Sequence, residues 1–444
     1  MKIIHLFLLF MNFSLFFCNF EISFKYQSPK KNVNDFLFNY FHNDLIVETH
    51  LGSNSQFLPL QIKFRSYYTF VISKDNDGFE NIYNPNSSDT SKKLSDSFIG
   101  EEEFGFSTIY SDIFSIENQK ISEFNFIFSN KLSIFKHLKS SGVLGFNLAL
   151  TYSYNVDSLI KQLKQKKLIN DYYFSLIYTN ENDGKITIGK KYDEKKYEQI
   201  GQSANAFESS NYEIGWNIKM SNIILDYENN KTEIAKNKNT FFYPEFIGII
   251  ADLHYFNLIE KEFFSKFKEC KKDIFHLEGY DKLEEDIEEY STYGDMNYFI
   301  CDEKGFNPKD FPNITFYSSS LNLTFTFDYK DLFVKNENNY YHLVVAPVDD
   351  SLHYIIGKPI FKNYILEFNY DRKIMNVYVK KSNSKSSKFF VLYIFLVLII
   401  ISIIIYIIYF KFIIHKLKKK RQANELIEDY NSSFLEKNVN KLGI

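Results

Sequence analysis

The feature that most constrains this chain is an uninterrupted apolar run near its C-terminal end. Residues 389–410 contain no charged side chain. At about 1.5 Å per residue, a helix of this length crosses a hydrocarbon core of about 30 Å. We therefore expect a transmembrane helix over residues 389–410. Basic residues mark the cytosolic side of such a helix, and they are concentrated just after the run, which places the tail, residues 411–444, in the cytosol. They are Lys411, Lys416, Lys418, Lys419, Lys420 and Arg421.

The N-terminal residues carry a second targeting pattern. Lys2 is followed by an apolar stretch from Ile3 to Phe17, which is typical of a secretory signal peptide. A buried N-terminal strand is the alternative interpretation. With a signal peptide over residues 1–20, the chain is expected to be a single-pass type I membrane protein. Its large domain is then extracellular or in a secretory or vacuolar lumen, and the net charge of -3 gives no reason to expect nucleic acid.

Cysteines and sequons agree with that compartment. Of the three cysteines, Cys18 lies in the predicted signal peptide, so Cys270 and Cys301 remain as one pair, for which we predict a disulfide. Two cysteines without a nearby histidine pair do not make a zinc site, and we expect no metal and no cofactor. Four sequons predict a glycosylated surface. Their asparagines are Asn86, Asn230, Asn313 and Asn322.

The large domain has the pattern of an all-β protein with minor helices. Short apolar or alternating runs are separated by Asn, Ser, Asp and Gly, and a hydrophobic content of 45% can fill more than one core. The periodicity predicts helices over residues 157–163 and 260–268. We expect a first lobe over residues 21–191, a linker over residues 192–211 and a second lobe over residues 212–381.

Several motifs in the large domain resemble those of pepsin-like aspartic proteases. Leu51 to Ile72 resembles the first active-site strand and loop, and Ser141 to Phe146 resembles the Gly-Ile-Leu-Gly-Leu motif. Residues 173–189 are similar to the hairpin that follows it, and His353 to Asn369 is similar to the final Ile-Leu-Gly motif and strand. The resemblance implies a bilobal acid protease fold. It also implies that Cys270 and Cys301 close the second-lobe disulfide loop.

The resemblance also locates the expected catalytic loops and the flap. Where the family has Asp-Thr-Gly-Ser, the chain has Lys63, Phe64, Arg65 and Ser66. Lysine is protonated near neutral pH and accepts no hydrogen bond, so it cannot replace the first carboxylate. The flap has diverged as well, and it lacks the tyrosine at its tip. Candidate flap or cleft residues are Phe98 and Gly100.

The second catalytic loop has two registers that the sequence leaves open. The strand-like run from Phe246 ends at Ala251, so either Ala251 or Asp252 stands at the second catalytic position. Only the second register keeps a carboxylate. In that register Lys63 and Asp252 form an ion pair where the family has its two acids, unless Lys63 simply points into solvent.

These observations favour a membrane-anchored pseudoprotease that binds an extended peptide or protein between its lobes without cleaving it. The first alternative is an active aspartic endopeptidase of secretory or surface proteins with divergent loops. The second is a glycosylated display or adhesion protein. The sequence contains no His-Glu-x-x-His, Gly-x-Ser-x-Gly or phosphate-binding glycine motif that would indicate another hydrolase or a nucleotide enzyme.

Overall fold

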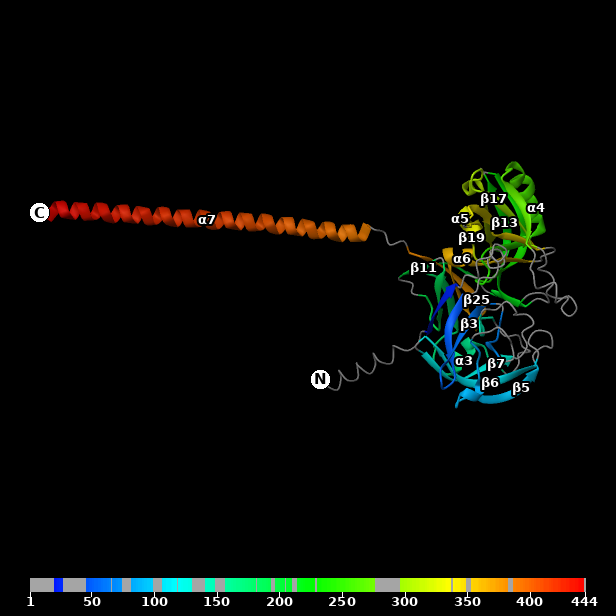
Figure 1. Ribbon diagram of the computed structural model, residues 1–444. Helices are drawn as coiled ribbons and strands as arrows, with labels where there is room; N and C mark the ends of the chain where they lie inside the picture. Colours follow the sequence, from blue (N-terminus) through cyan, green and yellow to red (C-terminus); the bar gives the residue numbers. More distant parts are fainter. Residues whose placement is uncertain are drawn as a thin grey trace. The chain divides into compact units, whose positions relative to one another are not determined.

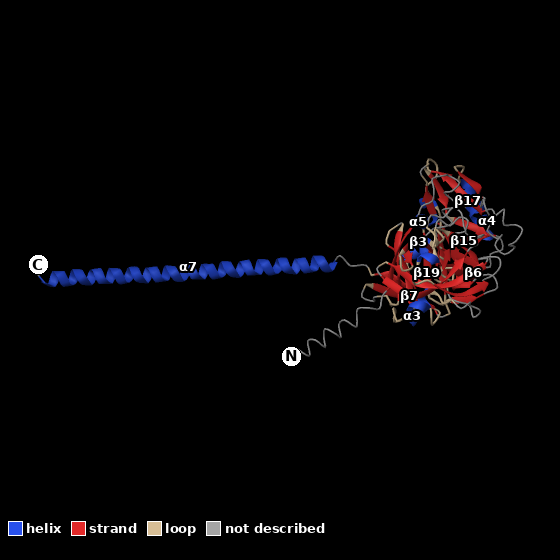
Figure 2. Cartoon of the chain, turned by 60° about the horizontal axis from the view of Figure 1, so that its bottom comes forward, coloured by secondary structure: helices blue, strands red, loops and turns tan. Residues whose placement is uncertain are grey.

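The computed structural model describes residues 20–442 with internal gaps. The chain divides into two compact units, Met1–Lys380 and Lys381–Ile444. Strands dominate the first unit, and the second contains a single long helix (Figures 1 and 2). Most of the predicted signal peptide lies outside the described residues. The gaps are residues 27–44, 65, 74–80, 99–105, 118, 130–139, 148–155, 181, 193–195, 204, 210–213, 228–229, 276–295, 337, 349–352 and 382–385.

The first unit is built on a 13-stranded sheet to which both ends of the unit contribute. Its strand order is β11-β25-β24-β9-β10-β1-β2-β3-β8-β4-β7-β6-β5. The strands are β1 (Phe20–Tyr26), β2 (Leu45–Leu51), β3 (Gln56–Lys63), β4 (Phe70–Ile72), β5 (Lys92–Phe98), β6 (Phe106–Ile116), β7 (Gln119–Ser129), β8 (Gly142–Gly145), β9 (Tyr173–Tyr178), β10 (Asp183–Ile188), β11 (Tyr197–Ser203), β24 (Ile365–Asn369) and β25 (Ile374–Lys380).

An eight-stranded and a four-stranded sheet form the second lobe. The larger has the path β19-β18-β13-β14-β23-β15-β22, with β12 beside β13, and the smaller has the order β16-β17-β21-β20. The strands are β12 (Phe207–Ser209), β13 (Ile214–Tyr227), β14 (Asn230–Phe242), β15 (Ile249–Asp252), β16 (Cys270–Phe275), β17 (Met296–Asp302), β18 (Asn313–Ser318), β19 (Leu323–Phe327), β20 (Phe333–Lys335), β21 (Tyr340–Leu343), β22 (Val345–Val348) and β23 (His353–Ile356).

Short helices connect these strands. The helix predicted at residues 157–163 is observed as α3, which Ser158 caps. The helix predicted at 260–268 begins earlier, because the Asp252 side chain caps the N-terminus of α4. The helices are η1 (Pro85–Ser87), α3 (Leu159–Gln165), α4 (Leu253–Glu262), η3 (Phe264–Lys266), η5 (Pro308–Asp310), α5 (Tyr329–Leu332) and α6 (Lys358–Asn363).

One hydrophobic core runs through both lobes. In β2 and β3 the buried side chains largely alternate with more exposed ones, as expected for strands with one covered face. The predicted linker, residues 192–211, contains β11, which pairs with β25, and β12, which pairs with β13. The C-terminal strand β24 pairs with β9 of the first lobe. Strands from the residue ranges of both predicted lobes therefore meet in the 13-stranded sheet.

The second unit contains α7 (Ser386–Leu442), which includes the whole of the predicted span at residues 389–410. In the part of the chain that the structure describes, one helix is long and apolar enough to cross a membrane. It is described with side chains over Phe395–Ser433, and an 18-residue window within it has a mean hydropathy of 2.8. Its apolar side chains are exposed, for example Phe395, Ile405 and Tyr406. Such exposure of apolar side chains is what a helix that crosses a membrane requires.

Candidate functional site

Two loops hold equivalent places in the two lobes. The first connects β3 to β4, and the second connects β14 to β15. In the first lobe β3 runs parallel to β8, while β4 is antiparallel to β8 and parallel to β7. In the second lobe β14 runs parallel to β23, while β15 is antiparallel to β23 and parallel to β22. The two lobes therefore repeat one arrangement of four strands around each loop.

Glycines support this equivalence. Gly145 follows Leu144 at the end of β8, and Gly357 follows Ile356 at the end of β23. A side chain on Gly145 would come within 2.5 Å of the Ser66 carbonyl oxygen, and one on Gly357 within 2.0 Å of the Phe246 carbonyl oxygen. Each glycine therefore lies directly against the backbone of its own loop, where only a residue without a side chain fits.

The strand pairing fixes which residues correspond between the loops. Lys63 pairs with Gly145, and Phe242 pairs with Ile356, so the next residue, Tyr243, is level with Gly357. The same number of residues separates Lys63 from Phe70 as separates Tyr243 from Ile250. Lys63 and Tyr243 are therefore the equivalent positions of the two lobes.

This pairing corrects the register suggested by the sequence. Ala251 and Asp252 lie on β15, opposite Pro347 and Val348, and therefore follow the second loop instead of standing in it. An apolar run such as Ile249–Ala251 indicates a buried strand, but it does not indicate whether that strand enters a loop or leaves it. The residues that the sequence analysis missed are Tyr243, Pro244 and Glu245.

Asp252 has a structural role at its observed position. Its Oδ1 atom accepts a hydrogen bond from the Tyr255 backbone N–H at 2.9 Å, which caps α4. Its Oδ2 atom lies 3.9 Å from the Lys238 Nζ atom. Burial, with Asp252 nearby, raises the pKa of the Tyr354 hydroxyl. The pair predicted between Lys63 and Asp252 is therefore replaced by a pair between Lys238 and Asp252.

Phe64, which follows Lys63, fills the space between the lobes. It is fully buried, and its ring lies 5.7 Å from the rings of Phe146 and Phe174, 5.8 Å from Phe368 and 6.0 Å from Phe361. Phe146 directly follows β8, whereas Phe361 lies on α6. The first loop thus contributes an aromatic contact that reaches both halves of the unit.

Glu245 makes the polar contact between the two loops. Its side chain is 3% exposed, and its Oε1 atom accepts a hydrogen bond from the Phe64 backbone N–H at 3.1 Å. The neighbouring Pro244 carbonyl accepts a hydrogen bond from the Tyr178 hydroxyl at 3.2 Å. The Lys358 Nζ atom lies 5.3 Å from the centre of the Tyr178 ring. A carboxylate on one loop is therefore bonded to the backbone of the other.

The other candidate residues of the first lobe are partly described. Lys63 is half-buried at the end of β3. Ser66 Oγ donates to the Tyr68 carbonyl at 3.1 Å, so it stabilises the loop itself. The predicted flap is the hairpin of β5 and β6, in which Phe98 pairs with Phe106. Arg65 and Gly100 lie outside the described residues.

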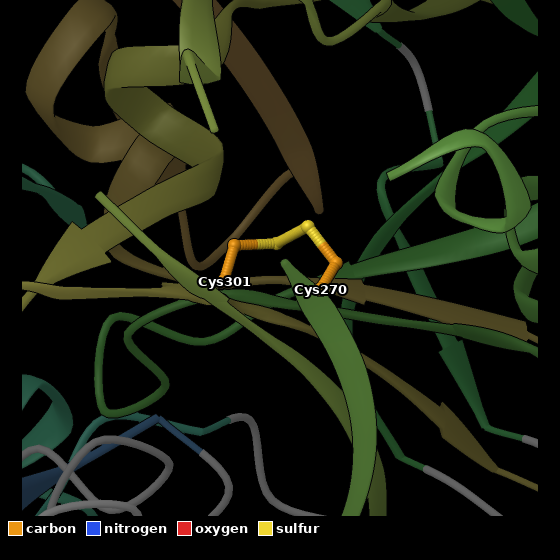
Figure 3. Close-up of a disulfide and its surroundings, with 2 residues drawn as sticks. All are labelled: Cys270 and Cys301. Carbon is orange, nitrogen blue, oxygen red and sulfur yellow. A yellow bond between two sulfur atoms is a disulfide. The ribbon is translucent and has the colours of Figure 1, made fainter. Parts of the chain in front are cut away.

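The disulfide predicted between Cys270 and Cys301 is confirmed. The two cysteines face each other on the neighbouring strands β16 and β17 (Figure 3), and their sulfur atoms are 2.06 Å apart. Among the candidate glycosylation sites, Asn86, Asn313 and Asn322 are exposed. Asn230 begins β14. Among the described residues, no group of three or more His, Cys, Asp or Glu side chains could hold a metal ion.

This two-lobed β architecture, with paired loops at the lobe interface, defines the class of the protein. Residues 46–240 match the family model of the eukaryotic aspartyl proteases. Over residues 46–240 the chain therefore carries a pepsin-like aspartyl protease domain, and the fold predicted from the sequence is confirmed. Comparison with curated proteins gives no match.

Proposed function

We propose that the first unit is a membrane-anchored pseudoprotease, which holds an extended peptide or protein segment between its lobes without cleaving it. The observation that carries this proposal is the make-up of the two interlobe loops. Lys63 and Tyr243 stand at the equivalent positions of the two lobes. An aspartic protease needs a pair of carboxylates at its lobe interface, one acting as base on water and the other as acid.

Glu245 is the carboxylate that the described part of the two loops provides. It is buried, and one of its oxygen atoms is bonded to the Phe64 backbone. A single carboxylate does not reproduce a pair that shares one proton, because the acid and base roles belong to two groups. The chemistry of these loops therefore supports contact between the lobes better than hydrolysis.

Peptide binding is the remaining use of the fold. An extended chain can add to an exposed strand edge through backbone hydrogen bonds, which need no catalytic residues. Among the described strands, the large sheet ends at β11 on one side and at β5 on the other, and β5 belongs to the flap hairpin, where it pairs with β6. We further propose a type I orientation, with this unit outside the cytosol and α7 as the anchor. The disulfide is consistent with an oxidising compartment.

The test is to incubate the purified full-length chain with a degenerate peptide library from acidic to neutral pH, beside a working pepsin-like protease. We expect captured peptides of unchanged length and no product. Cleavage that a statine-type inhibitor blocks would establish an active aspartic endopeptidase. A chain that neither captures nor cleaves any peptide would favour the display protein.

A matched variant sharpens the result. Glu245→Gln keeps a hydrogen-bond acceptor beside Phe64 but removes the carboxylate. Any cleavage that depends on the two loops should disappear in this variant, whereas peptide capture should persist. Loss of capture with unchanged folding would instead place Glu245 in direct contact with the ligand.

A further inference from the structure

A dense group of cations follows the apolar part of α7, and we propose that it binds anionic phospholipid headgroups. We call it the basic segment. It lies within one continuous helix, and its side chains are exposed. From Phe395 to Asn424 the helix contains no acidic residue, and the first is Glu425. The basic segment consists of Lys416, Lys418, Lys419, Lys420 and Arg421.

Helix geometry fixes the height of the basic segment above the span. At about 1.5 Å per residue, Lys416 lies roughly 9 Å beyond Phe410 along the helix axis, and Arg421 roughly 17 Å. The headgroup layer extends several ångströms beyond the hydrocarbon core, and the Debye length in physiological salt is about 8 Å. The basic segment therefore begins within electrostatic reach of the headgroups.

The distribution of charge around the helix supports a lipid as the partner. Successive residues of an α-helix are rotated by about 100°, so five cations at these positions point in all directions around the axis. A protein partner that docks on one face would contact only some of them. A ring of headgroups surrounds a membrane-crossing helix on every side and can attract cations that point in any direction, and clustered Lys and Arg beside a span attract anionic lipid.

The test uses the full-length chain reconstituted in phosphatidylcholine vesicles that contain one-fifth phosphatidylserine. Spin-labelled phosphatidylserine or phosphatidylcholine at trace level reports how much of each lipid is immobilised at the protein. We expect phosphatidylserine to be favoured by at least about fivefold, since each basic residue near the surface adds to the attraction. In 0.5 M salt the Debye length is about one-third of its value in dilute buffer, so the charges are screened. The preference for phosphatidylserine should then fall towards one.

The variant that replaces Lys418, Lys419, Lys420 and Arg421 by Gln should lose most of the preference. Its control replaces the same number of exposed lysines in the first unit by Gln and should keep the preference. An equal preference in wild type and the first variant, or no preference in wild type, would overturn the proposal. Phosphatidylglycerol should act like phosphatidylserine, and a strong difference between them would contradict binding by charge. The control lysines are Lys219, Lys271, Lys304 and Lys309.

Discussion

The two interlobe loops lie in the same arrangement of strands, but they hold the lobes together by different chemistry. The first loop does so with an apolar side chain, because the Phe64 ring is buried among aromatic rings from both halves of the unit. The second loop does so with a charged side chain, because the Glu245 carboxylate accepts the Phe64 backbone N–H. Residue 64 receives both contacts, one through its ring and one through its backbone.

The comparison teaches that the strand arrangement does not depend on the residues of the loops. What the arrangement requires is a glycine below each loop, and Gly145 and Gly357 meet that requirement. The loop residues themselves are free to change as long as the space between the lobes is filled and buried polar groups are bonded. The first loop meets the packing requirement, and the second meets the hydrogen-bonding one.

Removing the Phe64 ring should have the largest effect. Phe64→Ala leaves a cavity among four aromatic rings, and such substitutions destabilise by about 3–5 kcal/mol. Because the ring contacts both halves, we expect calorimetry to show two unfolding transitions where the wild type shows one.

The control is Phe114→Ala, which also removes a buried ring. Phe114 stacks on Phe124 at 4.6 Å, and both belong to the first lobe. It should lower stability by a comparable amount without separating the transitions. If Phe64→Ala keeps a single transition, the aromatic contact does not couple the lobes.

The second largest effect should be a loss of stability at acidic pH, because the second lobe contains a buried histidine. His342 on β21 is 4% exposed, its Nε2 atom lies 2.9 Å from Asn336 Nδ2, and its ring stacks on Tyr298. Burial, opposed by the charge of Asp273, lowers the pKa of His342 to about 4 from 6.5. The folded chain therefore keeps this ring neutral between pH 6.5 and 4, while the unfolded chain binds a proton.

Stability from His342 is thus present above pH 6.5 and is lost as the pH falls towards 4. The difference in pKa between the unfolded and the folded chain corresponds to a loss of roughly 3 kcal/mol in the free energy of unfolding near pH 4. Denaturant titrations across this range should show the loss in wild type and much less of it in His342→Gln. The exposed His254→Gln control should behave like wild type. If the free energy of unfolding falls with pH as steeply in His342→Gln as in wild type, other groups cause the acid sensitivity.

The difference between the loops also explains what the sequence could predict. In the first lobe the alternation of Leu58, Leu60 and Ile62 predicted a strand, which is observed as β3, and the Ser141–Phe146 motif contains the glycine that pairs with Lys63. In the second lobe the strand that enters the loop, β14, is polar over most of its length, and only Phe241 and Phe242 mark its buried end. Because β15 is more apolar, the sequence favoured it as the strand that enters the loop. The second catalytic position was therefore placed at Ala251 or Asp252, one strand after its equivalent.

The hydrogen bond from the Phe64 N–H to Glu245 could not be predicted with either Ala251 or Asp252 at the second catalytic position, because it joins residues that are distant in the sequence. No periodicity in the sequence indicates that the Phe64 N–H donates to a side chain of the other loop. An isolated acidic residue in a turn-like Tyr-Pro-Glu sequence more often indicates a solvated loop. Only the approach of the two lobes makes it a buried acceptor.

Changing Glu245 should have the smallest effect and should separate its two roles. Glu245→Ala leaves the buried Phe64 N–H without its acceptor, which costs about 1–3 kcal/mol, whereas Glu245→Gln keeps an acceptor and should cost less. Hydrogen exchange at the Phe64 amide measures the contact directly. It should accelerate strongly in Glu245→Ala and little in Glu245→Gln, while the amide of Leu144 on β8 serves as the reference. Equal protection of the Phe64 amide in wild type and Glu245→Ala would mean that the aromatic packing alone holds the lobes together. The second loop would then fill space as the first one does, and the contrast between them would disappear.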